Sequence, residues 1–250
     1  MKPSPSRLSV IVPVRNRSGV RAENCLRSLR WQTLEDVEIV LSDFGSSPEE
    51  RDALAAIAKK YDARVVTTAT DALWNRSRAL NLGLQAATAP LAVCTDIDML
   101  FSPTFLEEVV RGIETHDGEA LVVCRCRDLP ESVPEQPWEV SDYPELERQS
   151  TFRKAMGTGA CQGAPLSFFE RVRGYDERYV YWGFEDKDMV SRAERAGLSL
   201  VWIHETTSML HQWHRRMAED KLHWKYHNKL RFYLTKHRVV KNRAGWGERS

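Results

Sequence analysis

At 250 residues, with 42% hydrophobic and 28% charged residues, the chain has the composition of a soluble globular protein with one large α/β domain or two small ones. No apolar run approaches the roughly 18 to 20 residues that span a bilayer, and residues 1–7 lack the apolar core of a signal peptide. The five cysteines include no Cys-x-x-Cys pair, which argues against a disulfide framework and a zinc site. We therefore expect a cytoplasmic protein.

Stretches with strand and helix character alternate through the first half of the chain. We expect strands at residues 8–14, 37–42, 64–68, 91–95 and 119–125, and helices at 22–32, from Pro48, around 74–84, and at 104–114 with Ser102 as its cap. This alternation predicts an α/β fold with a mostly parallel central sheet flanked by helices. No G-x-G-x-x-G follows the first strand, which argues against a dehydrogenase.

Charged side chains follow three of these strands. Arg15 and Arg17 come after the first strand, Asp43 after the second, and Asp96 and Asp98 after the fourth. Ligands of open α/β sheets bind at the carboxyl ends of the strands. Two carboxylates facing the same way there would suit Mg²⁺ or Mn²⁺ and a diphosphate, although a solvated turn is an equal alternative on this triplet alone.

The second half is less regular. We expect residues 128–149 to form a long surface excursion, either a mobile lid or an acceptor loop, and residues 198–203 to form the last strand. Glu185 and Asp186 precede a helix at 189–196 and follow an aromatic, flexible segment that includes Trp182. The carboxylates could simply cap the helix, but aromatic faces beside carboxylates also hold sugars, which makes Asp186 a candidate general base.

Histidines follow the last expected strand. His211 and His214 are three residues apart and could reach one metal if the segment is helical. The alternative is that each imidazole is exposed or hydrogen-bonded without any metal.

Five motifs follow one another along the chain: Pro13-Val-Arg-Asn-Arg17, the run from Trp74 to Gly83, Thr95-Asp-Ile-Asp98, Gly174-Tyr-Asp176, and the run from Tyr181 to Asp188. In this order they resemble the motifs of GT-A glycosyltransferases. The first half resembles the large inverting family two, and the second half resembles the module shared by β-1,4-galactosyltransferases and chondroitin-polymerase-type enzymes. The resemblance covers about residues 8–214.

That resemblance implies a GT-A fold and a UDP-sugar donor bound along the strand ends. It implies Asp98 as a metal ligand, assisted by Asp96, with Mn²⁺ or Mg²⁺ as the cofactor. Glu185 would bind the acceptor hydroxyl and Asp186 would deprotonate it for in-line attack. The remaining donor-binding residues that it implies are Pro13, Arg15, Arg17, Asp43 near the uracil, Trp74, Arg76, Asp96 near the ribose and sugar, Ile97 and Trp182.

Two departures from the family pattern leave details open. The galactosyltransferase pattern has an extra glycine before the Glu-Asp pair that is absent here, so the details of the acceptor contacts stay open. The ligating histidine could be His211 or His214, and we favour His214 with His211 assisting.

Positive charge is concentrated near the C-terminus: residues 211–250 contain eleven Lys and Arg residues and three Asp and Glu residues. A helix at 221–237 would carry an apolar face of Leu222, Tyr226, Leu230, Tyr233 and Leu234. It either docks on the domain with a solvated basic side, or residues 215–243 meet an anionic partner such as a lipid-linked glycan or the inner face of a membrane. Nucleic acid is the least favoured partner.

We therefore predict a single GT-A domain with a nucleotide-sugar half at 7–126, an acceptor half at 127–214 and a basic extension at 215–250. The predicted function is metal-dependent, inverting transfer of a hexose from a UDP-sugar to a glycan, lipid-linked or other hydroxyl acceptor. A retaining transferase on the same scaffold and a non-catalytic nucleotide- or glycan-binding protein are the alternatives; Glu-Asp rather than Glu-Asn disfavours the first.

Overall fold

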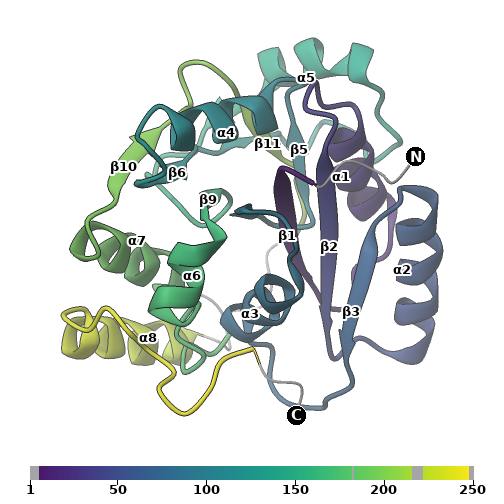
Figure 1. The fold of residues 1–250 in the computed structure, drawn as a ribbon. Coiled ribbons are helices and arrows are strands. Elements are labelled where there is room, and N and C mark those ends of the chain that lie inside the picture. Colours follow the sequence, from purple (N-terminus) through teal and green to yellow (C-terminus); the bar gives the residue numbers. More distant parts are fainter. Residues whose placement is uncertain (1–5, 182, 216–221, 248–250) are drawn as a thin grey trace, which may run out of the picture.

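A seven-stranded sheet forms the centre of the computed structural model, which describes residues 6–181, 183–215 and 222–247 (Figure 1). Its strand order is β10-β6-β9-β4-β1-β2-β3. All neighbouring pairs are parallel except those of β9, which runs antiparallel to β4 and β6. The strands are β1 (Leu8–Val14), β2 (Val37–Phe44), β3 (Arg64–Thr68), β4 (Leu91–Cys94), β6 (Ala120–Val123), β9 (Gln162–Pro165) and β10 (Ser199–Trp202).

Helices cover both faces of this sheet, because alternate residues of its strands are apolar on each side. Val10 and Val12 of β1 face α1 (Val20–Arg30), α2 (Pro48–Lys60) and α4 (Phe105–Glu114) in one buried cluster. Ile11 faces the other cluster, with α3 (Arg76–Ala86), α6 (Leu166–Val172) and α7 (Glu185–Arg195). The predicted parallel sheet flanked by helices is confirmed.

Close approach of α3 to β1 depends on a glycine. A Cβ on Gly83 would lie 2.4 Å from Cγ2 of Ile11. Real Cβ atoms do not make contacts this short, so the helix can lie against the sheet only with glycine here. The packing sets the N-terminus of α3, and with it Arg76, beside the carboxyl ends of β1 and β4.

A second, four-stranded sheet has the order β5-β11-β7-β8. Its strands are β5 (Met99–Phe101), β7 (Arg127–Asp128), β8 (Thr151–Phe152) and β11 (Met209–His211). The strand predicted at 198–203 is confirmed as β10, but it is not the last strand, because β11 follows it. Three residues are too few to show a period, and β11 is stabilised by antiparallel pairing with β5, in which His211 lies opposite Met99.

The expectation of a long surface excursion at 128–149 is also partly wrong. A 3-10 turn (Val140–Asp142) leads into α5 (Tyr143–Gln149). Tyr143 and Leu146 are buried with Leu129, Leu100 and Leu210. These long-range apolar contacts stabilise a helix too short to reveal itself by periodicity.

Ser102 does not cap α4 as predicted. Its hydroxyl hydrogen-bonds Thr207 at 2.6 Å. The N-cap residue is Thr104, which makes no side-chain cap bond, and Oε1 of Gln32 accepts the backbone N–H of Leu106 instead.

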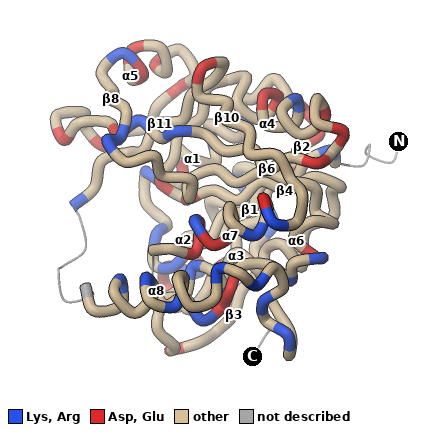
Figure 2. Tube along the Cα trace, turned by 90° about the vertical axis from the view of Figure 1, so that its left-hand side faces the viewer, with Lys and Arg blue, Asp and Glu red and all other residues tan. Residues whose placement is uncertain are grey.

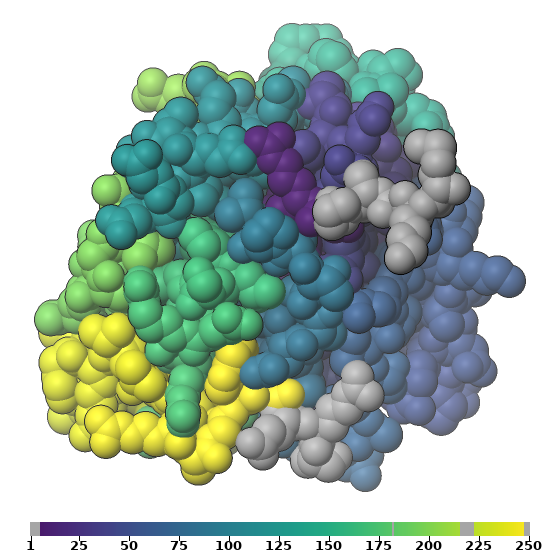
Figure 3. Space-filling view, viewed as in Figure 1, coloured from purple at the N-terminus to yellow at the C-terminus, as the bar shows by residue number. Residues whose placement is uncertain are grey.

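The C-terminal part of the chain contains α8 (Leu222–Thr235) and a segment that returns across the molecule (Figure 3). That segment lies against the end of α6, where the Asn242 amide donates to Arg173 O at 2.8 Å. The side of α8 that packs on the domain carries buried Asn228 and part-buried Arg231 rather than the predicted apolar face. Within the described ranges, no helix is long and apolar enough to cross a membrane.

Candidate active site

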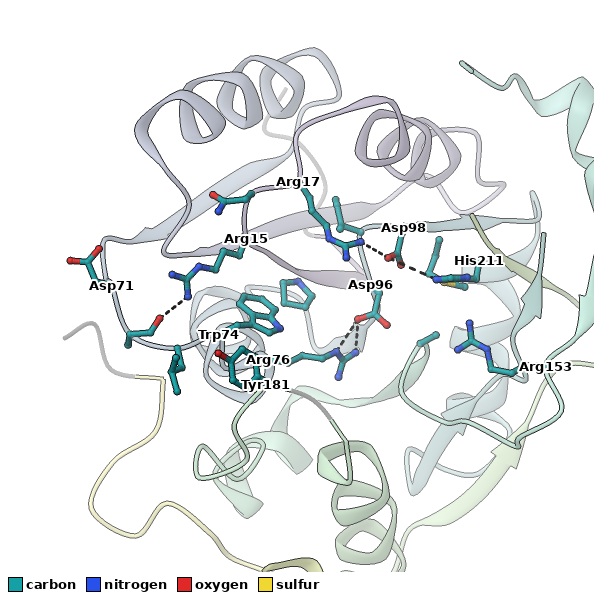
Figure 4. A pocket seen from close by; sticks show the side chains of 17 residues that line it. Arg15, Arg17, Asp71, Trp74, Arg76, Asp96, Asp98, Arg153, Tyr181 and His211 are labelled. Carbon is teal, nitrogen blue, oxygen red and sulfur yellow. Dashed lines mark hydrogen bonds and ion pairs between the residues drawn. The ribbon is translucent and has the colours of Figure 1, made fainter. Parts of the chain in front are cut away.

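A cavity of about 620 Å³ opens at the carboxyl ends of β1 and β4 (Figure 4). Four arginines line it, and most of the other lining side chains are acidic, aromatic or apolar. Such a surface suits a ligand with a flat base and several negative charges. The lining residues are Pro13, Arg15, Asn16, Arg17, Asp71, Ala72, Leu73, Trp74, Arg76, Asp96, Ile97, Asp98, Met99, Arg153, Ala160, Tyr181 and His211.

Two histidines lie beside Asp98 at one end of this cavity. His214 Nε2 lies 3.2 Å, and His211 Nε2 3.9 Å, from Oδ2 of Asp98. One ligand atom from each of the three residues lies within 4.8 Å of the others. A carboxylate oxygen with two imidazole nitrogens is a donor set that Mn²⁺ and similar divalent ions accept. The structure brings both candidate histidines to Asp98, so the choice between them does not arise.

Strand pairing explains this convergence. β5 begins directly after Asp98, and β11 ends at His211 opposite Met99. The backbone N–H of Gln212 donates to the carbonyl of Asp98 at 2.9 Å, which continues the pairing by one more step. Residues more than a hundred positions apart are thereby fixed side by side.

The charges around Asp98 keep it ionised. Burial alone would raise its pKa, but the hydrogen bond with His214 and the charges of His211 and Arg17 outweigh burial and hold the pKa at about 2. Arg17 donates to Oδ2 at 2.7 Å. The contact with Asp98 in turn raises the pKa of His214.

Asp128 and Arg153 belong to this site, although the sequence did not single them out. Oδ1 of Asp128 lies 3.2 Å from Nδ1 of His211, which leaves the other ring nitrogen directed toward Asp98. Arg153 donates to both oxygens of Asp128 through Nε, at 3.1 and 3.2 Å, and lines the cavity. A carboxylate behind a metal-binding histidine orients its ring. Only the pairing of β7 with β11 and β8 reveals these contacts, since no local motif surrounds either residue.

Asp96 has a different partner. Nε of Arg76 donates to its Oδ1 at 2.8 Å, and another Arg76 nitrogen donates to Gly159 O at 2.7 Å. Asp96 is absent from the metal-ligand cluster of the described residues, which comprises Asp98, His211 and His214. Asp96 therefore lies on the cavity wall beside Arg76.

The two carboxylates at the start of α7 lie behind Arg76. Oε1 of Glu185 is 3.9 Å from Nη1 of Arg76. Burial and the neighbouring charge of Asp186 raise the pKa of Glu185 to about 7, with Arg76 opposing. Asp186 is partly exposed and accepts a hydrogen bond from the Thr158 hydroxyl at 3.2 Å. Neither carboxylate lines the cavity itself, but a Cβ on Gly159 would lie 3.4 Å from Cβ of Asp186, and the next residue, Ala160, lines the cavity.

The remaining predicted residues fall into three groups. Pro13, Trp74 and Ile97 line the cavity, and Arg15 donates to Ala72 O at 2.6 Å on its rim. Asp43 is fully buried below the lining: its Oδ1 accepts the Ser46 N–H at 3.2 Å, whereas its Oδ2 has no hydrogen-bond partner among the described residues. Trp182 lies outside the described residues.

The backbone that carries the aromatic segment is held to α3. The Tyr181 N–H donates to Trp74 O at 2.8 Å, and Asn75 forms a bridge with Tyr181. Phe184, just before Glu185, has a left-handed φ of 74°. These contacts set the start of α7 beside the cavity.

Comparison with known proteins agrees with this architecture. The fold is of the GT-A type, since TarS of S. aureus, whose structure was solved in complex with UDP, superposes with a TM-score of 0.61 at 15% identity over 83% of this chain and 60% of that one. Residues 9–173 match glycosyl transferase family 2, so the chain belongs to this family. Residues 145–215 also match the N-terminal domain of galactosyltransferase.

Curated relatives carry transferase names. The chain is 26% identical to a validoxylamine A glucosyltransferase of Streptomyces hygroscopicus, covering 80% of this chain and 54% of that protein. It is 23% identical to the N-acetylglucosaminyl-diphospho-decaprenol L-rhamnosyltransferase of Mycobacterium tuberculosis, covering 94% and 85%, and 20% identical to chondroitin synthase of Escherichia coli, covering 76% and 32%. The chain spans about half the length of the validoxylamine A glucosyltransferases that it matches.

Proposed function

We propose that the chain is a metal-dependent, inverting glycosyltransferase that moves a hexosyl group from a UDP-sugar to an acceptor hydroxyl. The observation that carries this proposal is the cluster of Asp98, His211 and His214 at the end of an arginine-lined cavity. Membership of glycosyl transferase family 2 supports the class of reaction. The UDP in the TarS complex supports the choice of nucleotide.

The cavity wall supplies the groups that a UDP-sugar needs. Arg15 and Arg17 neutralise the diphosphate, while Pro13, Trp74 and Ile97 offer apolar surface. Oδ2 of Asp43, which makes no hydrogen bond among the described residues and lies 3.6 Å from Nε of Arg51, accepts a hydrogen bond from the uracil ring. Asp96, held by Arg76, accepts hydrogen bonds from the ribose and the donor sugar.

Asp98, His211 and His214 would hold Mn²⁺ or Mg²⁺. The donor set fits such an ion, since the carboxylate is ionised and Asp128 leaves one nitrogen of His211 directed toward it. When bound, the ion neutralises the charge that develops on the departing diphosphate.

Asp186 acts as the base. The acceptor oxygen attacks the anomeric carbon and its proton passes to the Asp186 carboxylate, while the bond from that carbon to the diphosphate oxygen breaks and UDP leaves. Glu185 positions the acceptor, and the Thr158 hydroxyl holds Asp186 in place. The acceptor is a glycan, a lipid-linked glycan or another hydroxyl compound.

A binding screen tests the donor site. We expect UDP-sugars to raise the melting temperature in the presence of Mn²⁺ more than GDP- or TDP-sugars do. Asp98→Asn should remove the dependence on Mn²⁺, because the cluster loses its only charged oxygen ligand. Asp117→Asn, in an exposed turn, is the matched control. Equal shifts for all three nucleotides, or an Asp98→Asn protein with unchanged Mn²⁺ dependence, would refute the proposed site.

A further inference from the structure

Helix α8 presents large apolar side chains to solvent. Tyr226, Leu230, Tyr233 and Leu234 are 63%, 61%, 55% and 64% exposed. Their spacing of four, seven and eight residues places them on one stripe of the helix. Single exposed apolar residues are common on protein surfaces, but a contiguous stripe of four indicates a surface with a partner.

Polar contacts on the opposite side fix this orientation. Nδ2 of Asn228 donates to Val180 O at 2.9 Å, and Arg231 donates to Asp176 Oδ2 at 2.6 and 3.0 Å. Asn228 is fully buried, and Arg231 is mostly covered. Turning the apolar stripe inward would break these contacts and take one charged partner from the buried Asp176 carboxylate, so the stripe stays on the outside.

The surroundings of the stripe are basic. Lys229 and Lys236 are exposed along one edge of it, and Nζ of Lys236 lies 5.3 Å from the ring of Tyr233. Residues 222–247 contain no Asp or Glu at all. Figure 2 shows the basic positions along α8. An apolar stripe edged by lysine complements a surface that is apolar inside and anionic outside.

The helix also adjoins the cavity. The ring of Trp224 lies 6.0 Å from that of Tyr181, which lines the cavity, and the ring of Phe232 lies 5.7 Å from that of Phe184, next to Glu185. These contacts lie on the side of α8 that faces the domain, so α8 itself separates the stripe from the aromatic segment that precedes the carboxylates.

We propose that α8 docks on an anionic lipid bilayer. Tyr226, Leu230, Tyr233 and Leu234 enter the boundary between headgroups and acyl chains, and Lys229 and Lys236 pair with lipid phosphates. The cavity would then face acceptors presented at the membrane surface. This docking does not depend on the chemistry proposed for the cavity.

Co-sedimentation of the full chain with vesicles tests the docking. We expect binding to phosphatidylcholine vesicles that contain about a third phosphatidylglycerol, little binding to pure phosphatidylcholine, and loss of binding at about 0.5 M salt. Leu230→Ser/Leu234→Ser should weaken binding at least tenfold, since it removes two inserted side chains, and Lys229→Ser/Lys236→Ser should weaken it roughly 25-fold at low salt.

Matched controls lie far from α8. Val140→Ser removes an apolar residue that is 45% exposed, and Lys59→Ser/Arg148→Ser removes two exposed charges; both should bind vesicles like the unmodified chain. Circular dichroism confirms that each variant is folded. No binding to anionic vesicles, or equal loss in the controls, overturns the proposal. Two other results would also overturn it. One is a stripe variant that binds vesicles normally but no longer self-associates in sedimentation velocity. The other is an unmodified chain that binds single-stranded RNA and not vesicles.

Discussion

Asp96 and Asp98 are two residues apart, yet they have different neighbours. Asp98 meets His214, His211 and Arg17, whereas Asp96 meets Arg76. The sequence predicted that both carboxylates lie at the end of β4, because an apolar strand directly precedes them. It could not predict their partners, since those come from three other elements. The difference supports the proposal of separate roles, in which Asp98 binds the metal ion and Asp96 binds the donor sugar.

Glu185 gives a prediction about stability and pH. Its pKa rises from the ordinary 4.5 to about 7 in the folded protein, chiefly because the side chain is buried. The folded state therefore holds a proton that the unfolded chain has released between pH 4.5 and 7, and stability falls as the pH rises through this window. We expect Glu185→Gln to be more stable than the unmodified chain by about 3 kcal/mol at pH 8 and about equal to it at pH 4.5.

Urea denaturation at the two pH values measures this difference. Glu194→Gln, exposed on the same helix, is the control and should change stability little at either pH. A gain that is the same at pH 4.5 and pH 8 would show that the effect does not come from the charge of Glu185.

At the scale of elements, the regular helices and longer strands of the first half were predicted and are confirmed. The nearly continuous apolar run of 8–14, the β-branched run of 37–42 and the Pro-Glu-Glu opening of the helix from Pro48 mark these elements in the sequence itself. Elements of two or three residues, such as β7 and β11, were not predicted because tertiary pairing alone stabilises them. The cluster of Asp98, His211 and His214 depends on β11, so the sequence suggested the residues of the cluster but not their geometry.

The segment after α8 is tied to α7 through a buried charge. Nζ of Lys241 lies 3.1 Å from Oδ1 of Asp188 on α7 and 3.5 Å from Oδ2 of Asp176. Its side chain is fully buried, and this helix begins with Glu185 and Asp186. The contact therefore ties the C-terminal segment to the element that carries the proposed base.

Removing this ammonium should be costly. We expect Lys241→Met to lower the free energy of unfolding by about 3 kcal/mol, because two buried carboxylates lose a partner. Lys59→Met, on the exposed side of α2, should change it by less than about 0.5 kcal/mol. Chemical denaturation compares the two, and an equal effect would mean that the buried pair contributes nothing.

At the scale of the whole molecule, three parts of the fold meet at the carboxyl edge of the central sheet. They are the ends of its parallel strands, the second sheet and the start of α7. The cavity, the Asp98 cluster and the proposed base all lie there, each supplied by a different part of the chain. The order of motifs in the sequence predicted this family of fold, and family 2 membership confirms it. The exposed apolar stripe of α8 was not foreseen, because a helical pattern shows which residues share a face but not which face packs.

Slow hydrolysis of the best-binding UDP-sugar, followed by NMR before the released sugar mutarotates, tests the central proposal most directly. With Mn²⁺ we expect an α-linked donor to give the β-sugar first, at a rate that Asp186→Asn lowers at least 100-fold while donor binding is retained. Asp117→Asn, in an exposed turn after α4, should leave the rate unchanged. Three results would contradict the account: release of the α-sugar first, a hydrolysis rate that does not depend on Mn²⁺, or an Asp186→Asn protein with an undiminished rate.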